Sequence, residues 1–249
     1  MRSSKRLTTK DLALTTCFAA LYAVLSFLPL SQLVGLFSKA ITAATIIAPL
    51  IGMILGAYLG VFSTFLGGLV SLFVSPFFSP SSLVAGVISS LFAGWLYTGK
   101  RSISVFVYSS LLFLFGFYPF VGPVWIYPYL MWFQVIGLLI LISPLQTMAL
   151  KMLNSNINSR LLSALLITSL VSTLAGQIAG SVTFELTSWP IFLADLNAWR
   201  ADWQVLTFLY PVERAIIAFV AALIGVPLLK ATKTMNMTFR FHQKRENDI

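Results

Sequence analysis

The residues that can do chemistry in this 249-residue chain are few, because 58% of its residues are hydrophobic and only 9% are charged. A soluble domain carries about 25% charged residues. The long stretch from residue 161 to residue 229 contains six charged side chains, namely Glu185, Asp195, Arg200, Asp202, Glu213 and Arg214. In a chain this apolar, such exceptions are the first candidates for a functional site.

Glu185, Glu213 and Arg214 lie nearest to apolar segments that are long enough to enter a membrane. Ionisable side chains at membrane depth are costly, so they usually face the interior of a helix bundle or a cavity, and they pair. Two interpretations follow. Arg214 forms a structural pair with Glu185 or Glu213, or these residues anchor a ligand in a pocket on the outer side.

Several kinds of site are excluded by composition. The chain has a single cysteine, Cys17, and a single histidine, His242 in the polar tail. Disulfide frameworks, histidine-based zinc sites and Ser-His-Asp triads therefore lack their residues. There is no P-loop and no His-Glu-x-x-His motif, so we expect no enzyme activity, no metal and no cofactor.

Aromatic and polar residues gather in two predicted outer segments. Tyr127 lies in the turn 117–129, and Trp189 and Asn197 lie in a predicted outer loop, 184–205. Tryptophan and tyrosine collect at membrane interfaces, so an aromatic girdle is one interpretation. The other is a lined entrance in which these side chains stack on and hydrogen-bond a flat polar ligand. Residues 190–204 are also amphipathic and can form an interfacial helix or lid.

Two uncharged polar residues, Gln134 and Gln177, lie inside predicted spans. Each can serve as a ligand donor or form a hydrogen bond between helices. We include Gln177 among the candidate binding residues, together with Glu185, Arg214, Glu213, Trp189, Asn197 and Tyr127.

The elements that must position these residues are apolar segments, and a spanning helix needs roughly 20 apolar residues. The chain is predicted to be an all-α, multi-pass integral membrane protein of the cell membrane. It forms a single domain of about eight transmembrane helices, with a predicted helical hairpin at 103–150. The predicted spans are 11–30, 41–57, 58–74, 82–99, 103–118, 124–150, 160–183 and 206–230.

Two of these assignments leave alternatives open. The run 41–74 is either two short helices that break near Gly56 to Gly60 or one long helix plus a re-entrant piece. The basic N-terminus resembles the start of a signal peptide, but its apolar stretch exceeds the usual 7–15 residues and no cleavage site follows. We therefore expect a retained first helix.

The orientation follows from the positions of the basic residues. If both tails, 1–10 and 232–249, are cytoplasmic, thirteen of the sixteen basic residues face inward, and only Lys39, Arg200 and Arg214 do not. The net charge of +9 is then mostly a collar facing anionic lipid headgroups, and nucleic acid is not an expected partner.

Small residues four apart let helices approach closely in lipid. The first helix carries such a pair, Ala19 and Ala23. Ordinary internal packing of the bundle explains such pairs, and the functional interpretation is docking of a separate membrane subunit, for which Ala19 and Ala23 are the best candidates.

Several segments resemble the substrate-binding S components of energy-coupling factor (ECF) transporters. They are residues 9–24 at the start of the chain, Ala-Pro-Leu-Ile-Gly at 48–52, and the last helix, Tyr-Pro-Val-Glu-Arg-Ala-Ile at 210–216 through 225–230. The resemblance covers roughly 9–100 and 160–231, and the insertion at 103–150 departs from it.

This resemblance implies a six-helix bundle that captures a vitamin-like small molecule on its outer side. It also implies docking on a transmembrane coupling subunit that is powered by separate ATPases, with Ala19 and Ala23 at the contact and residues 31–39 as a gating loop. The alternative is a non-catalytic structural subunit of a larger membrane complex. A closed core with Glu185 and Arg214 paired would favour that alternative.

Overall fold

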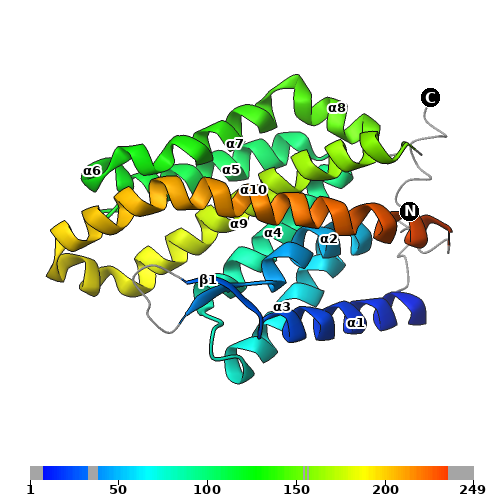
Figure 1. Cartoon of the computed structure of the whole chain (residues 1–249), viewed down its shortest axis with the longest axis horizontal. Coiled ribbons are helices and arrows are strands. Elements are labelled where there is room, and N and C mark those ends of the chain that lie inside the picture. Colours follow the sequence, from blue (N-terminus) through cyan, green and yellow to red (C-terminus); the bar gives the residue numbers. More distant parts are fainter. Residues whose placement is uncertain (1–7, 33–38, 154, 156, 235–249) are drawn as a thin grey trace, which may run out of the picture.

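The computed structural model of the chain is a bundle of helices whose axes run mostly along the long dimension of the molecule (Figure 1). It describes residues 8–32, 39–153, 155 and 157–234, without the side chains of 189–193, 233 and 234. The elements are α1 (Thr9–Leu25), β1 (Pro29–Gln32), β2 (Ala40–Thr42), α2 (Ala44–Leu55), α3 (Ala57–Val74), α4 (Pro80–Tyr97), α5 (Arg101–Gly116), α6 (Pro123–Ile126), the 3₁₀ helix η1 (Pro128–Met131), α7 (Trp132–Ile142), α8 (Pro144–Met152), α9 (Asn158–Ala194) and α10 (Leu196–Thr234).

Helix starts follow the local sequence. Thr8 accepts a hydrogen bond from the backbone N–H of Asp11, whose carboxylate accepts one from the backbone N–H of Thr8, which is a capping box. Ser79 and Ser143 cap α4 and α8, and in both cases proline follows as the first helical residue.

The predicted helical membrane protein is observed, with one small addition. The strands β1 and β2 form an antiparallel hairpin between α1 and α2, so the described part of the chain is not purely helical. The hairpin is tied to the loop before α4, because Ala40 N–H donates to Phe77 O and Lys39 Nζ donates to Pro76 O, both at 3.0 Å.

Four helical segments among the described residues are long and apolar enough to cross a membrane. They are Ala44–Val74, Pro80–Tyr97, Asn158–Ser188 and Leu196–Thr232. The pair Pro128–Ile142 and Pro144–Met152 makes a fifth if it counts as one span, although it is bent by 64°. The expectation of eight full spans is therefore not met by length and composition, which support four or five.

The run predicted at 41–74 breaks at Gly56, which has a φ of +78°. α2 and α3 then lie against each other, since a Cβ on Gly60 would come within 2.9 Å of the Gly52 Cα. The first alternative for this run, two short helices, is the observed one. With 12 residues, α2 is about 18 Å long, shorter than the roughly 30 Å hydrocarbon core.

The predicted outer loop, 184–205, is helical almost throughout. α9 continues to Ala194 and α10 begins at Leu196, so Asp195 alone separates two long helices. Asp195 Oδ1 accepts the backbone N–H groups of Asn197 and Ala198 at 3.0 Å, which caps α10 and allows such a short turn. No separate interfacial helix is present in this segment.

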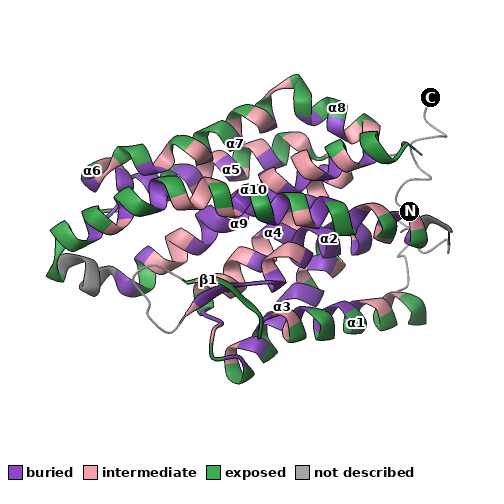
Figure 2. Ribbon diagram, in the orientation of Figure 1, coloured by how far each residue is buried: buried purple, intermediate pink, exposed green. Residues whose placement is uncertain are grey.

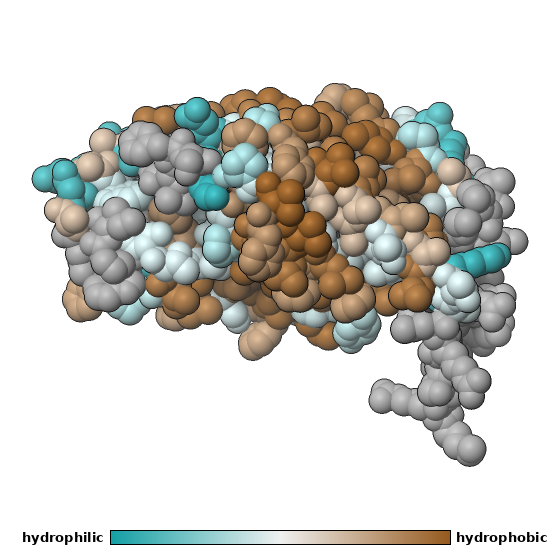
Figure 3. All heavy atoms as spheres, turned by 90° about the horizontal axis from the view of Figure 1, so that it is seen from below, coloured by the Kyte–Doolittle hydropathy of each residue, from teal (hydrophilic) through white to brown (hydrophobic). Residues whose placement is uncertain are grey.

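Side chains in the interior form two apolar clusters, one around α2 and one between α5, α7, α9 and α10. Buried and exposed positions alternate along the helices (Figure 2). The outward faces are themselves apolar, with Phe73, Phe106 and Phe208 each more than 70% exposed. In Figure 3 apolar surface covers the middle of the molecule, and polar surface gathers toward both ends. This surface is suited to lipid.

Candidate small-molecule binding site

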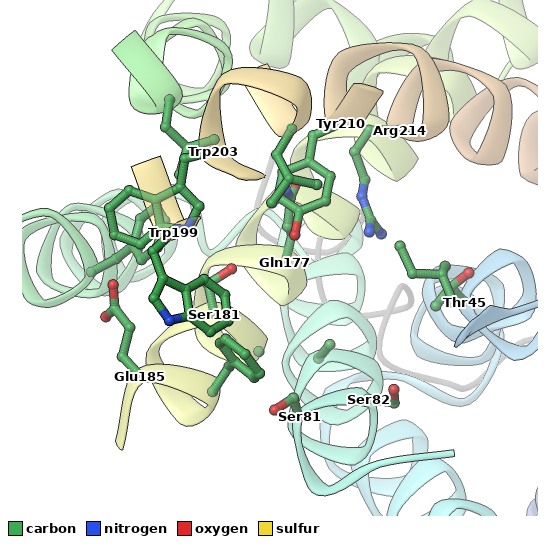
Figure 4. A pocket seen from close by; sticks show the side chains of 17 residues that line it. Thr45, Ser81, Ser82, Gln177, Ser181, Glu185, Trp199, Trp203, Tyr210 and Arg214 are labelled. Carbon is green, nitrogen blue, oxygen red and sulfur yellow. The ribbon is translucent and has the colours of Figure 1, made fainter. Parts of the chain in front are cut away.

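A pocket opens between α2, α4, α9 and α10, near the end of the molecule where α9 passes into α10 (Figures 1 and 4). It encloses about 830 Å³ that protein atoms do not fill, including the open space at its mouth. The lining residues are Ile41, Thr45, Ser81, Ser82, Ala85, Phe115, Leu130, Gln177, Gly180, Ser181, Phe184, Glu185, Trp199, Trp203, Leu206, Tyr210 and Arg214.

Two helices supply most of the polar lining because their residues recur at helical spacing. Gln177, Ser181 and Glu185 are each four residues apart on α9, so they share one face. The lining residues of α10 follow each other at steps of three or four and form a second stripe, composed of Trp199, Trp203, Leu206, Tyr210 and Arg214. Figure 4 shows side chains of both stripes around the pocket, with Gln177 near Tyr210 and Arg214 and with Glu185 near Trp199.

Glu185 is only 1% exposed, and neither carboxylate oxygen has a hydrogen-bond partner among the described residues. Burying a charged group without a partner is costly. The structural pair that the sequence allowed is not formed, since Glu185 and Arg214 lie on opposite sides of the pocket (Figure 4). Both carboxylate oxygens of Glu213 also lack partners in the described part of the chain, so Glu213 forms no hydrogen-bonded pair with Arg214 either.

Arg214 and Gln177 are each 6% exposed. The Arg214 Nε and both amide atoms of Gln177 have no hydrogen-bond partner within the described structure. Buried polar groups in proteins are nearly always hydrogen-bonded, to protein atoms or to something else. Three such groups around one pocket indicate a site in which a bound molecule or water supplies the missing partners.

Aromatic rings form the rest of the wall. Phe184 and Trp199 meet edge to face with their centroids 5.7 Å apart, and Trp203 and Tyr210 continue the wall along α10. Flat apolar walls with a few polar groups between them are typical of small-molecule sites.

Of the seven predicted binding residues, the structure brings three together, Glu185, Gln177 and Arg214. Glu213 does not line the pocket, because the next residue along a helix is turned by roughly 100°. Asn197 is exposed on the first turn of α10, and Tyr127 packs against Tyr129 with ring centroids 5.5 Å apart, outside the pocket lining. The side chain of Trp189 lies outside those that the structure describes.

Other lining residues were missed. Trp199 and Trp203 lie in the segment 190–204 that was expected to form an interfacial helix or lid, yet they are 6% and 4% exposed and face the pocket. The steps of three and four from Trp199 to Arg214 were visible in the sequence and would have placed them on the face of Arg214. Thr45, Ser81 and Ser82 carry no comparable signal, because they begin helices that only the fold brings here.

Among the small residues of α1, Ala19 packs inside the bundle, against α3. Ala19 is buried, and a Cβ on Gly67 would collide with its carbonyl oxygen, so α1 and α3 cross closely at this point. Ala23 is half-buried, whereas Ala13 and Ala20 are exposed.

No family model, curated protein or solved structure matches this chain.

Proposed function

We propose that this protein is the substrate-capture subunit of an ECF-type importer. It binds a vitamin-like small molecule at its outer end and docks on a transmembrane coupling subunit that separate ATPases drive. The observation that carries the proposal is the pocket at the α9–α10 end, where the Glu185 carboxylate, the Gln177 amide and the Arg214 Nε are buried without a hydrogen-bond partner among the described residues.

The fold supports this function in two further ways. The chain contains several helices long enough to span a membrane, so it is embedded in one. The hairpin β1–β2 contributes Ile41 to the pocket lining, so we expect it to help cover a captured molecule, whereas residues 33–38 of the expected gating loop lie outside the described residues. The expectation of a coupling subunit and of separate ATPases comes from the family resemblance of residues 9–100 and 160–231.

A structural subunit would need no pocket. Among the described residues the site is open and Glu185 and Arg214 do not pair with each other, so it lacks the closed core and the ion pair that would favour that alternative. We therefore retain the transport function as the single proposal.

The test is affinity purification of the tagged full chain in mild detergent, followed by identification of associated proteins and of bound small molecules. Ser181→Phe fills the pocket, whereas Ser163→Phe makes the same change at an exposed position of α9. We expect wild type and S163F to bring down an ATPase pair and to retain a small molecule, and S181F to retain only the protein partners. Absence of both the ATPases and any bound molecule from the wild type would refute the proposal.

A further inference from the structure

The pocket continues toward the middle of the bundle as a second, smaller hollow. Thr45, Ala85, Gln177 and Arg214 line both spaces, so they form a floor between them. The rest of the second hollow is lined by further residues of α2, α4 and α9, namely Ala48, Gly86, Ser89, Thr173 and Gly176. The floor is therefore the innermost part of the main pocket.

This floor carries a positive charge and hydrogen-bond donors, and the Glu213 carboxylate is near enough to interact electrostatically with Arg214. Arg214 brings a guanidinium group whose Nε has no partner among the described residues, and the unpartnered amide of Gln177 lies beside it (Figure 4). α2 begins at Ala44, one residue before Thr45, and no side chain caps this helix start. The N-terminal end of a helix carries a partial positive charge and binds anions. These groups suit a carboxylate or phosphate oxygen.

The outer end of the pocket, at Glu185, carries a hydrogen-bond acceptor instead of donors. Glu185 lies two helical turns beyond Gln177 on α9, which corresponds to roughly 12 Å of rise. Its carboxylate is buried and only accepts hydrogen bonds when ionised. It therefore suits an ammonium, an amidine-like nitrogen or another strong donor. Phe184, Trp199, Trp203 and Tyr210 line the space between the two ends.

From these placements we infer that the captured molecule is amphoteric, flat and extended. Its anionic oxygen group faces inward to Arg214, Gln177 and the start of α2, and its cationic or hydrogen-donating nitrogen group faces outward to Glu185. This inference rests on the proposed capture function and adds the substrate class and the direction in which the substrate lies.

The experiment loads the purified full chain with the low-molecular-mass filtrate of yeast extract, washes it, releases what is bound with methanol and identifies it by mass spectrometry. Released compounds are also tested on cation- and anion-exchange media. We expect a compound that wild type retains and S181F does not, and that carries both an acidic and a basic group. Its formula distinguishes a carboxylate from a phosphate.

Two variants test the two ends. Arg214→Gln and Glu185→Gln each remove one charged hydrogen-bond partner, so we expect each to lower retention of that compound by roughly tenfold to a hundredfold. The matched changes Arg200→Gln and Asp202→Asn lie on α10 outside the pocket lining and should leave retention unchanged. Melting temperature in detergent reports folding, and E185Q should not lower it, because the variant removes a buried charge that has no partner in the described structure.

The outcomes separate the two proposals. A retained compound that is neutral or carries one sign of charge overturns the inference and leaves the capture function standing. Retention by R214Q or E185Q at the wild-type level does the same. If wild type retains nothing that S181F lacks, the capture function fails and the inference falls with it. The charge of the compound retained by wild type decides the question even if a variant does not fold.

Discussion

At the scale of single residues, one of the closest contacts in the bundle involves a hydroxyl without a partner. Tyr22 on α1 is fully buried, and its hydroxyl makes no hydrogen bond to any described residue. It reaches α4 at Gly86, where a Cβ would collide with the hydroxyl oxygen and come within 2.9 Å of Cζ. Gly86 is thus required by close approach, and most of the conflict comes from one oxygen atom.

This contact predicts that the effects of substitutions at Gly86 and Tyr22 on the free energy of unfolding are not additive. We expect Gly86→Ala to destabilise the protein by about 1–3 kcal/mol, the usual cost of overpacking. Tyr22→Phe should be nearly neutral, because the lost hydroxyl has no partner among the described residues. In the double variant the nearest atom, the hydroxyl oxygen, is absent, so part of the loss from G86A should be recovered. Thermal unfolding in detergent measures the stability of the two single variants and of the double variant. If the double variant loses the sum of the two single losses, the two residues do not meet as described.

The sequence predicted the binding residues only where a rare residue type met an apolar helix. Glu185, Gln177 and Arg214 stood out because polar side chains are costly in such segments, and the structure places all three in the pocket. Tyr127 and Asn197 were selected by residue type in segments predicted to be loops. The direction of a side chain depends on the helix that carries it, and the α9–α10 turn at Asp195 was not apparent from hydropathy.

At the scale of elements, one arginine joins the start of α5 to the bend between α7 and α8. Arg101 Nε donates to Leu141 O at 2.8 Å, and its two terminal nitrogens donate to Ile142 O, to Ser143 O and to the Thr147 hydroxyl. These carbonyls end α7, where the last turn of a helix leaves acceptors without partners. Ser143 and Pro144 then start α8 in a new direction.

We therefore expect Arg101→Lys to lower the free energy of unfolding by about 1–3 kcal/mol, since a lysine ammonium cannot reach four acceptors spread over the bend. The matched change is Lys100→Arg, one residue earlier. Lys100 is exposed and lies over the Tyr58 ring at 5.6 Å, a contact that arginine can also make. K100R should be within about 0.5 kcal/mol of wild type. Equal melting temperatures for R101K and wild type would contradict a structural role for this arginine.

Breaks within apolar runs explain why the helices could be predicted from the sequence but the number of membrane spans could not. Helix type followed from apolar runs, and the observed bounds of α4 and α5 lie within two residues of the expected ones. The number of spans did not follow, because hydropathy records how apolar a run is and not where it turns. Gly56 and Pro144 divide two apolar runs, and three of the resulting pieces, α2, α7 and α8, are too short to cross a bilayer alone.

The outer face of α1 bears on docking. Ala19 packs against α3 and is therefore not accessible to a partner. A partner helix that docks on α1 would instead meet its exposed residues Ala13 and Ala20. We expect Ala20→Leu to leave the melting temperature unchanged and to reduce recovery of the coupling subunit several-fold, since close helix approach in lipid needs small residues. Ala215→Leu makes the same change at an exposed position of α10 and should have no effect. Full recovery of the partners with A20L would exclude this face.

At the scale of the whole molecule, the charges divide between its two ends. Lys10, Lys100, Arg101, Lys151, Arg160 and Lys230 lie at or near helix ends, and Lys230 Nζ donates to Asn158 Oδ1, which joins the end of α10 to the start of α9. Glu185, Asp195 and Asp202 lie at or near the turn from α9 to α10, which is at the other end of the molecule (Figure 1), and Glu185 lines the pocket there. The apolar middle separates these two ends. The positive-inside rule predicts that the basic end faces the cytoplasm, and the proposed function requires the pocket to face outward.

Cysteine labelling on whole cells tests this orientation. In a Cys17→Ser background, Asn197→Cys places a thiol at an exposed position of the pocket end, and Ser159→Cys places one at an exposed position of the basic end. We expect a membrane-impermeant maleimide to label N197C on intact cells and S159C only after permeabilisation. Labelling after denaturation controls for expression, and C17S alone gives the background. The reverse pattern would place the pocket in the cytoplasm, where it could not capture an external substrate, and it would contradict the proposed function while leaving the fold intact.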